Sequence, residues 1–143
     1  MPEYIHTVAI PTLVNKTSRF EVEIRLTDAV TREFVSRGNF RVAGDEEGAD
    51  AVLRGEITGF DVRPVGLGAR EQAQNYQVTV RASVTFIDQV QNKVLFTNSS
   101  FLFRDEYELE RDPGQFFDVE ILAIDAIATE FARSVVSSIL EGF

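Results

Sequence analysis

The 143-residue sequence contains no cysteine and no tryptophan, and it has a single histidine, His6. The absence of cysteine excludes disulfides, thiolate metal sites and a cysteine nucleophile. A single histidine has no partner for a histidine metal site, and no serine lies in the sharp turn that typically holds a catalytic nucleophile. We therefore expect no enzymatic activity, no catalytic or metal-binding residue and no cofactor. We interpret His6 as a surface residue of an edge-like strand.

The chain also lacks long apolar stretches and an excess of positive charge. No apolar run reaches the roughly 18 residues that cross a bilayer as a helix, so no transmembrane helix is expected. Lys and Arg number 14 against 23 Asp and Glu, which gives a net charge of −9 and a pI near 4.6. Because non-specific nucleic-acid binding depends on Lys and Arg neutralising phosphates, this balance argues against nucleic acid as a partner.

The composition is that of one folded domain. Apolar residues make up 44% of the chain and charged residues 26%, which is ordinary for a soluble globular protein. Twelve phenylalanines predict a core rich in aromatic rings. The length suits a single core, so we predict one domain over residues 1–143.

The first third of the chain predicts a strand, a turn and an amphipathic helix. Apolar residues indicate a strand over Ile5–Leu13, and a turn follows at Asn15–Ser18. Thr17 or Ser18 is placed to cap the helix, and Gly38 is expected to end it in a left-handed conformation. The apolar residues at helical spacing are Val22, Leu26, Ala29, Val30 and Phe34.

Two strands and a loop are predicted next. A short strand covers Phe40–Ala43, and a longer one covers Ala51–Val62. Gly55 and Gly59 lie inside the longer strand, where a second helix could rest on them, since glycine permits close packing. Residues 63–75 contain a proline and two glycines and are interpreted as a flexible connection.

A strict alternation marks the following strand, Tyr76–Phe86. Its apolar residues alternate with Gln77, Thr79, Arg81, Ser83 and Thr85. This pattern predicts one core face and one polar face in an antiparallel sheet. The polar face carries a single charge, and two interpretations stay open for it: a solvent face, or a contact face for a protein or a glycolipid.

A hairpin turn at Asp88–Asn92 then leads into a strand over Lys93–Tyr107, where the pattern changes phase. Val94 and Phe96 occupy even positions, whereas the apolar positions Phe101 and Phe103 that follow are odd. A β-bulge near Asn98-Ser99-Ser100 explains the change, because one extra residue exchanges the two faces of a strand.

The last third predicts a long helix. Glu108–Asp112 is interpreted as an acidic link, with Asp112 as the N-cap of a helix over Pro113–Glu141. Its apolar stripe consists of Phe117, Ile121, Ile124, Ala128, Phe131, Val135 and Ile139. At about 40 Å it is expected to be longer than the strands it covers, so its end or second face is expected to meet another chain.

Together these elements predict an α+β fold. It is a two-layer sandwich in which two helices pack on one face of a four- or five-stranded, mostly antiparallel sheet.

Other candidate sites have ordinary interpretations. The carboxylates between Asp105 and Asp112 could hold calcium, but they lack the glycine-punctuated spacing of a calcium loop and read as a solvated segment. Asp45-Glu46-Glu47 is a charged turn. Gly66-Leu67-Gly68 is too short and too far from a helix start to bind phosphate.

The order of the elements is more specific than any single motif. Val8–Thr17, an apolar run broken by proline and asparagine, leads to a helix closing on Phe34–Gly38. The strand Phe40–Val42 follows, and then Ala49–Phe60, opened by Ala-Asp and carrying two glycines. Further pieces are Tyr76–Val84, Phe101–Tyr107, Phe116-Phe117 and Ser134–Phe143. From about Ile5 to Phe143, this order resembles the LptE family of outer-membrane lipopolysaccharide-assembly lipoproteins.

The resemblance implies a non-enzymatic lipoprotein, lipid-anchored at the periplasmic face of the outer membrane. Members of the family plug the β-barrel translocon LptD and help deliver lipopolysaccharide to the outer leaflet. LptD, lipopolysaccharide and the membrane are therefore the implied partners. Family members begin with a lipidated cysteine after a signal peptide, and this sequence shows neither. We expect the natural gene to encode a leader that ends in such a cysteine shortly before Tyr4.

Lipopolysaccharide binding in the family is attributed to basic residues, although no motif fixes their positions here. Arg81, Lys93 and Arg104 lie on or near the polar strand face and are the expected contacts for lipopolysaccharide or the barrel. Two alternatives stay open. Periplasmic domains of the CsgG and TolB amino-terminal type share the opening order but are less similar after Phe60, and they would make the chain a secretion or envelope-assembly module that forms homo-oligomers. A cytoplasmic binding domain is the third interpretation.

Overall fold

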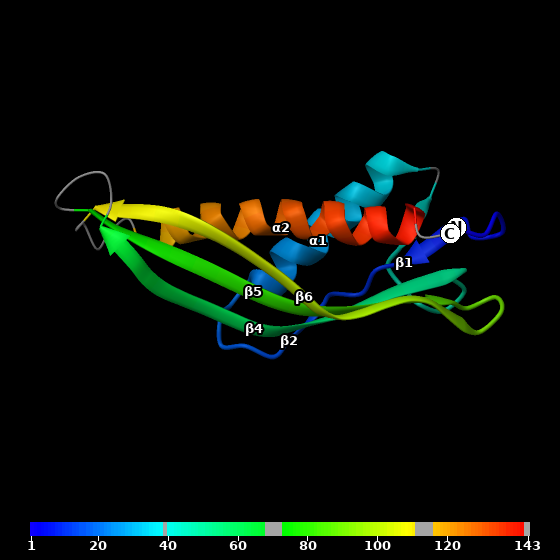
Figure 1. Cartoon of the computed structure of the whole chain (residues 1–143). Helices are drawn as coiled ribbons and strands as arrows, with labels where there is room; N and C mark the ends of the chain where they lie inside the picture. The colour runs from blue at the N-terminus through cyan, green and yellow to red at the C-terminus, as the bar shows by residue number, and fades with distance from the viewer. Residues whose placement is uncertain (39, 68–72, 111–115, 142–143) are drawn as a thin grey trace.

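Two helices lie on one face of a six-stranded sheet, so the chain folds in two layers (Figure 1). The computed structural model describes residues 1–38, 40–67, 73–110 and 116–141. In chain order the elements are β1 (Thr7–Ala9), β2 (Val14–Asn15), α1 (Val22–Arg37), β3 (Arg41–Ala43), β4 (Ala51–Leu67), β5 (Ala73–Asp88), β6 (Lys93–Glu110) and α2 (Phe116–Glu141). The predicted α+β sandwich is confirmed, with six strands in place of four or five.

Three short strands and three long ones make up the sheet. The strand order is β3-β1-β4-β5-β6, and β2 pairs with β4 further along. The short strands pair in parallel, β1 with β3 and β4, and β2 with β4. The long strands β4, β5 and β6 form an antiparallel meander, which makes the sheet mostly antiparallel as predicted.

The predicted first strand is split in two. β1 ends at Ala9 and β2 begins at Val14, and Pro11, which has no backbone N–H to donate, lies between them. β1 lies between β3 and β4, so the expectation of an edge strand near His6 is wrong. His6 itself is exposed, and its backbone N–H donates to a carboxylate oxygen of Asp50 at 2.8 Å.

β4 and β5 are longer than the sequence predicted. A connection was expected over residues 63–75, but β4 continues to Leu67 and β5 begins at Ala73. Residues 68–72 lie outside the described residues. The strand extends past Pro64 because pairing with β5 continues, and a register shift after Pro64 absorbs the irregularity.

β6 is also longer than expected, and its bulge is confirmed. It runs to Glu110, so the segment from Glu108 is strand and not a link. Ala82 of β5 pairs with Phe101 and Val84 pairs with Asn98, which leaves two serines of β6 opposite one residue of β5. This bulge returns Phe101 to the core side, where it packs against the buried core.

A second register shift in β6 corrects one prediction. Phe86 pairs with Phe96 but Ile87 pairs with Val94, so Leu95 is the extra residue. Val94 was expected on the core face with Phe96. The shift turns Val94 outward instead, and its side chain is 56% exposed.

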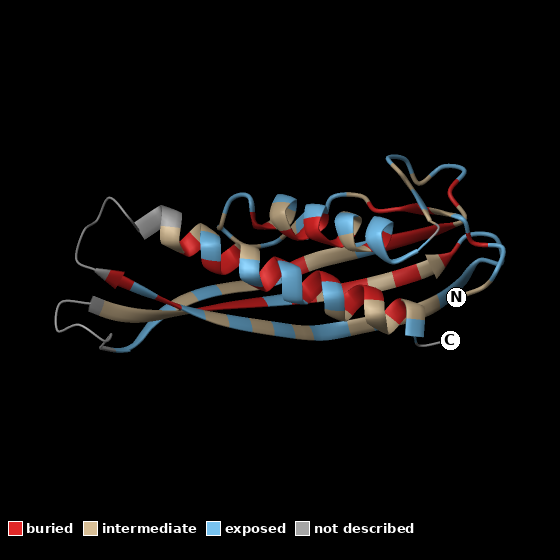
Figure 2. Cartoon of the chain, turned by 90° about the horizontal axis from the view of Figure 1, so that it is seen from above, coloured by how far each residue is buried: buried red, intermediate tan, exposed pale blue. Residues whose placement is uncertain are grey.

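The apolar stripe predicted for α1 is confirmed, because the five residues predicted to form it are all buried (Figure 2). Both ends differ from expectation. Glu21 occupies the N-cap in a left-handed conformation (φ 71°) with no side-chain cap, and the Thr17 hydroxyl accepts from the Arg19 N–H instead. Gly38 is extended (φ −162°), and glycine is needed there because a Cβ would lie 2.6 Å from the ring of Phe40.

α2 packs on β5 and β6. Its 26 residues span about 39 Å, whereas the 18 residues of β6 span about 60 Å. The helix is therefore shorter than the strands, and the predicted overhang is wrong. The described helix begins at Phe116, and the predicted start at Asp112-Pro113 lies outside the described residues.

The two glycines of β4 do not support α2 as predicted. A Cβ at Gly55 would meet the side chain of Leu13, and a Cβ at Gly59 would meet the side chain of Arg81. Phe131 of α2 packs instead edge-on against the rings of Phe101 and Phe103, with centroids 6.0 and 5.7 Å away. The aromatic core predicted from the composition therefore joins α2 to β6.

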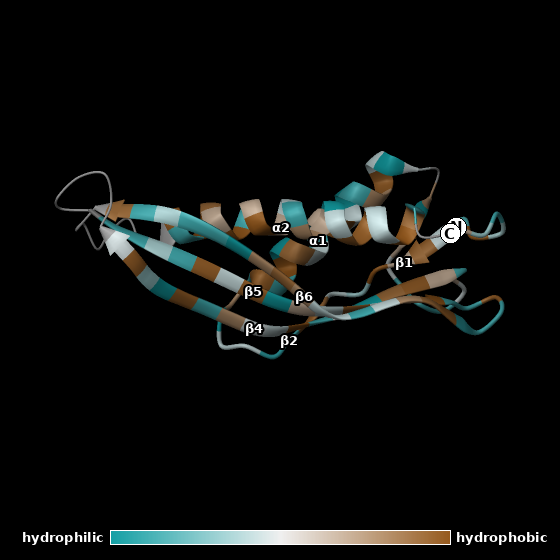
Figure 3. Cartoon of the chain, viewed as in Figure 1, coloured by the Kyte–Doolittle hydropathy of each residue, from teal (hydrophilic) through white to brown (hydrophobic). Residues whose placement is uncertain are grey.

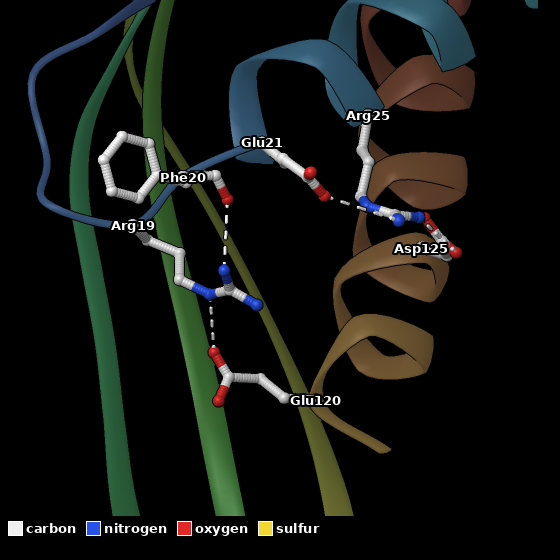
Figure 4. Close-up of polar contacts among 6 residues, drawn as sticks. All are labelled: Arg19, Phe20, Glu21, Arg25, Glu120 and Asp125. Carbon is white, nitrogen blue, oxygen red and sulfur yellow. Dashed lines mark hydrogen bonds and ion pairs between the residues drawn. The ribbon is translucent and has the colours of Figure 1, made fainter. Parts of the chain in front are cut away.

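Two ion pairs join α1 and the turn before it to α2 (Figure 4). Arg19 Nε lies 2.8 Å from Glu120 Oε1, and Arg25 Nη1 lies 2.8 Å from Asp125 Oδ1. They fix the first turn of α1 beside the beginning of α2. In the described parts of the chain, neither helix is long and apolar enough to cross a membrane.

Candidate functional site

The outer face of β4, β5 and β6 is the face opposite the two helices (Figure 1). Hydrophobic and hydrophilic bands alternate along these strands, as expected for a sheet with one wet face (Figure 3). The outward residues of β5 are those predicted, and the hydroxyls of Thr85 and Thr97 lie 3.2 Å apart across β5 and β6. Within the described residues, this face is a hydrogen-bonding surface that no element of the chain covers.

A shallow hollow crosses the outer face on the part of the strands remote from β1. It is lined by Asp61, Arg63, Gln77, Thr79, Arg81 and Arg104. The residues come from all three long strands, because Thr79 of β5 pairs with Asp61 of β4 and with Arg104 of β6. Three arginines and one aspartate give the lining a net charge of +2, on a chain whose formal net charge is −9.

Within the described residues, two of these arginine side chains have no polar partner. Arg63 pairs with Asp61 through Nη2 at 2.9 Å, but neither the Arg81 nor the Arg104 side chain forms an ion pair or a hydrogen bond there. Gly59 leaves room for the stem of Arg81, whose side-chain carbons lie 3.3–3.5 Å from where a Cβ would be. The stem is thus supported, and the guanidinium is available to an anion.

Between the two free arginines lies Thr79, which is only 6% exposed although it points to the outer face. The larger side chains around it account for this burial. The guanidinium groups of Arg81 and Arg104 therefore lie on two sides of the Thr79 hydroxyl. Guanidinium groups bind phosphate and carboxylate oxygens with paired hydrogen bonds, so an oxyanion is the ligand that this hollow fits.

Lys93, the third residue predicted from the sequence, is not in this hollow. It begins β6 and pairs with Asp88 at the hairpin, nine residues along β5 from Thr79 or about 30 Å. Burial raises the pKa of Asp88, but it is outweighed by the sum of the hydrogen bonds that the carboxylate accepts, from the Tyr4 hydroxyl and two backbone N–H groups of the hairpin turn, and the nearby charge of Lys93. The net result is a pKa of Asp88 below its ordinary value. The charge of Lys93 therefore acts on Asp88 at the hairpin and not on the hollow.

Asp61 and Arg63 were missed from the sequence. The sequence predicts a flexible connection at Arg63 and a strand at Asp61, and neither prediction points to a site. A signal was available, since Phe60 and Val62 alternate with Asp61 and Arg63 as core and outer residues do.

A second hollow lies on the outer face nearer to β1. It is lined by Pro11, Thr12, Val14, Glu46, Arg54, Gly55, Glu56, Ser83, Thr85 and Ile87. Its charged lining residues form ion pairs, Arg54 with Glu46 at 2.9 Å and Glu56 with Lys16 at 3.7 Å. The hydrogen bond from Arg54 holds the pKa of Glu46 below its ordinary value. The charged residues of the second hollow are therefore paired, in contrast to Arg81 and Arg104 in the first hollow.

Metal binding finds no support among the described side chains. There, no three histidine or carboxylate groups come together in a way that could hold an ion. Part of the acidic stretch considered for calcium, Arg111 and Asp112, lies outside the described residues.

Solved structures with a similar fold come from several bacteria. A lipoprotein structure from Caulobacter crescentus has a TM-score of 0.57 at 13% identity, covering 87% of this chain and 83% of that one. A minor lipoprotein from Acinetobacter baumannii has a TM-score of 0.52 at 13% identity, covering 96% and 92%. A neuraminyllactose-binding hemagglutinin homologue from Helicobacter pylori has a TM-score of 0.58 at 11% identity, covering 99% and 89%. At these identities the likeness shows the fold alone.

Sequence comparison gives the family. A search of curated proteins finds no match. The family model for LptE, described as lipopolysaccharide-assembly, matches residues 5–139. The match continues far beyond Phe60. Because it spans nearly the whole chain, this chain belongs to the LptE family of lipopolysaccharide-assembly proteins.

Proposed function

We propose that this chain is a non-enzymatic lipoprotein of the outer membrane that plugs and supports the β-barrel translocon LptD and aids delivery of lipopolysaccharide to the outer leaflet. Membership of the lipopolysaccharide-assembly family supports the class of function. The lipid anchor would be a cysteine encoded upstream of Tyr4, and reading the upstream coding sequence tests that part. An open reading frame without such a cysteine would contradict the anchor.

The observation that carries the proposal is the pair of free arginines, Arg81 and Arg104, on the uncovered sheet face. Lipopolysaccharide carries phosphate groups, and a guanidinium without an internal partner can bind phosphate at no loss of another ion pair. The chain is acidic overall, so this hollow is where an anionic lipid would meet local positive charge.

The rest of the outer face suits a barrel partner. Gln77, Ser83 and Thr85 offer hydrogen-bonding groups without charge, and the polar interior of a barrel offers matching groups. These uncharged positions can be enclosed without burying unpaired charges, each of which would be destabilising by several kcal/mol, whereas Arg81 and Arg104 need an anionic group opposite them. The proposed contact with LptD is therefore through the face opposite the helices.

The test uses charge reversal on the two faces of the protein. Arg81→Glu with Arg104→Glu should weaken lipopolysaccharide binding by at least about tenfold, since two phosphate contacts are replaced by repulsion. Arg133→Glu, an exposed residue of α2 on the helix layer, is the matched control and should bind like the parent. Lys93→Glu, remote from the hollow, should have a smaller effect than either arginine.

Co-purification with LptD tests the partner. The chain should be recovered with the barrel, and bulky substitution at Ser83 or Thr85 on the outer face should reduce recovery more than substitution on α2. Failure to recover the chain with LptD would remove the plug assignment. Equal loss of lipopolysaccharide binding in Arg133→Glu would remove the site assignment while leaving the family unaffected.

A further inference from the structure

Beyond the proposed function, β4 offers a second surface: one of its edges is only partly paired. β1 pairs with Ala51 and Val52, and β2 pairs with Glu56 and Ile57. From Thr58 onward, no strand among the described residues pairs with β4 on the side away from β5. We call Thr58–Pro64 the free edge; β4 forms the lower border of the sheet in Figure 1.

The backbone groups of the free edge can be assigned to sides. The carbonyl of Ile57 accepts from Lys16, so it points away from β5. Thr58 is the extra residue of a β-bulge opposite β5, and the backbone N–H and C=O of Gly59 then point toward β5. Because successive residues alternate, the unpaired side receives the backbone N–H and C=O groups of Phe60 and Val62 and the C=O of Pro64. Pro64, which has no N–H, thus lies where a strand tolerates proline.

Long sheet edges are normally protected against pairing, and the edge of β6 shows such protection. β6 is interrupted by two register shifts, and the half-buried Asp105 lies on its core face between apolar residues. Bulges and inward charges are devices that block strand addition. The free edge of β4 is bounded by a register shift at Thr58 and by Pro64 with a second shift after it, but between Gly59 and Arg63 it has no bulge, no proline and no inward charge, so this short stretch is the part of the two edges that can accept a strand.

The side chains of the free edge are complementary to themselves. Asp61 and Arg63 flank Val62, and both are exposed on the outer face, with side chains 51% and 66% accessible. In an antiparallel pair centred on Val62, Asp61 of one copy lies opposite Arg63 of the other, and the reverse holds as well. These are non-hydrogen-bonded positions, where side chains come closest.

We propose that the free edge of β4 pairs antiparallel with the same edge of a second copy, centred on Val62, to form a symmetric dimer. The two copies of Val62 exchange two backbone hydrogen bonds, and each Phe60 N–H donates to the Pro64 carbonyl of the other copy, which gives about four in all. Asp61 and Arg63, paired within one copy, exchange partners to form two ion pairs across the axis. The partly buried rings of Phe60 on the core side are covered by the second copy. The pairing is isologous, so it closes at two copies and forms no ring.

The paired segment is short, so the dimer should be weak. Its area falls well below the roughly 1,200 Å² of a standard interface, so association is expected in the range of tens to hundreds of micromolar. Sedimentation velocity over that range should show a monomer–dimer equilibrium. A protein that stays monomeric at the highest concentration would overturn the proposal.

Charge exchange tests the register. Asp61→Arg and Arg63→Asp should each weaken dimerisation by at least about tenfold, because like charges then face each other. An equimolar mixture of the two variants should dimerise again, and so should the double variant, since both restore opposite charges. Failure of both to recover would overturn this register. Circular dichroism melts confirm that the variants fold.

A single cysteine gives an independent test, because the chain has none of its own. Val62→Cys should form a disulfide-linked dimer under mild oxidation, since the two copies of residue 62 face each other within bridging distance. Thr97→Cys, on β6, is the control and should cross-link far less. Equal cross-linking of both would overturn the proposal. A second outcome would also overturn it: the chain stays monomeric and Asp61→Arg lowers its recovery with LptD. That result would assign the free edge to pairing with a strand of the barrel.

Discussion

Arg19 and Glu120 form an ion pair that connects the turn before α1 to the beginning of α2, with Nε and Oε1 2.8 Å apart (Figure 4). Their side chains are 20% and 5% exposed, so this pair is largely removed from water. Arg19 also donates to the carbonyl of Phe20 at 3.2 Å, which fixes the turn itself. Loss of one partner would leave a charge with little access to water.

The first prediction concerns this pair. Glu120→Ala should lower the free energy of unfolding by about 2 kcal/mol, because the remaining guanidinium, 20% exposed, is left largely desolvated without its anionic partner. Arg25→Ala removes the more exposed pair with Asp125, whose side chain is 48% exposed, and should cost less than about 1 kcal/mol. Urea unfolding measures both. Equal losses in the two variants would contradict the role of burial.

A second prediction concerns Glu21, whose φ of 71° is unusual for a residue with a side chain. Glu21→Gly should raise the stability by about 1 kcal/mol, since glycine adopts the left-handed region without strain. The 3.8 Å ion pair with Arg25 that it removes is exposed and contributes little. Asp28→Gly, within the exposed surface of α1, should instead destabilise by about 0.5–1 kcal/mol. Thermal melts of both variants separate relief of strain from the general cost of glycine.

A third prediction follows from Asp50. Its carboxylate accepts the backbone N–H of His6 at 2.8 Å and that of Thr7 at 3.0 Å, and these hydrogen bonds hold its pKa below the ordinary 3.8. A depressed folded-state pKa means that the unfolded chain binds the proton more readily. The stabilisation is therefore complete above about pH 5 and is lost as the pH falls toward about 2.

Asp50→Asn tests this sign. The variant should be less stable than the parent at neutral pH and should lose less stability between about pH 7 and pH 3. Asp28→Asn, on the exposed side of α1, should keep the pH dependence of the parent. Urea midpoints at the two pH values give the comparison. A pH dependence in Asp50→Asn as steep as that of the parent would show that other carboxylates account for it.

The features that the sequence predicted well are those fixed by local periodicity. The alternation from Tyr76 to Phe86 reports one wet face, and the phase change before Phe101 reports the bulge, because each depends only on which side of a strand faces the core. The stripe of α1 is local in the same way. These patterns were sufficient for the α+β class and the outward direction of Arg81 and Arg104.

What the sequence did not predict depends on distant partners. Pro64 reads as a breaker, yet β4 extends through it because β5 supplies pairing on the other side. The position of β1 between β3 and β4 depends on parallel pairing with segments far along the chain. The grouping of Lys93 with the two arginines is not confirmed, because a local pattern does not report distance along the sheet: Lys93 pairs with Asp88, whereas Arg104 pairs with Thr79.

The last prediction concerns Gly38, where the need for glycine comes from a neighbour and not from the backbone conformation. Its φ of −162° is accessible to any residue, but an added Cβ would lie 2.6 and 2.7 Å from two ring atoms of Phe40. Phe40 packs edge-on against the buried ring of Phe34 with centroids 6.0 Å apart, so it cannot move without disturbing the core. Gly38→Ala should therefore destabilise by about 1–3 kcal/mol.

Gly44→Ala is the matched control, because nothing lies within 4 Å of the position of its Cβ. It should change the stability by less than about 0.5 kcal/mol. The variant Gly38→Ala with Phe40→Leu separates the two explanations for a loss, since it removes the ring that the new methyl group meets. If the clash is the cause, adding Gly38→Ala to Phe40→Leu will cost less than adding it to the parent. If the backbone itself required glycine, the added loss would be the same in both backgrounds, and the steric argument would fail.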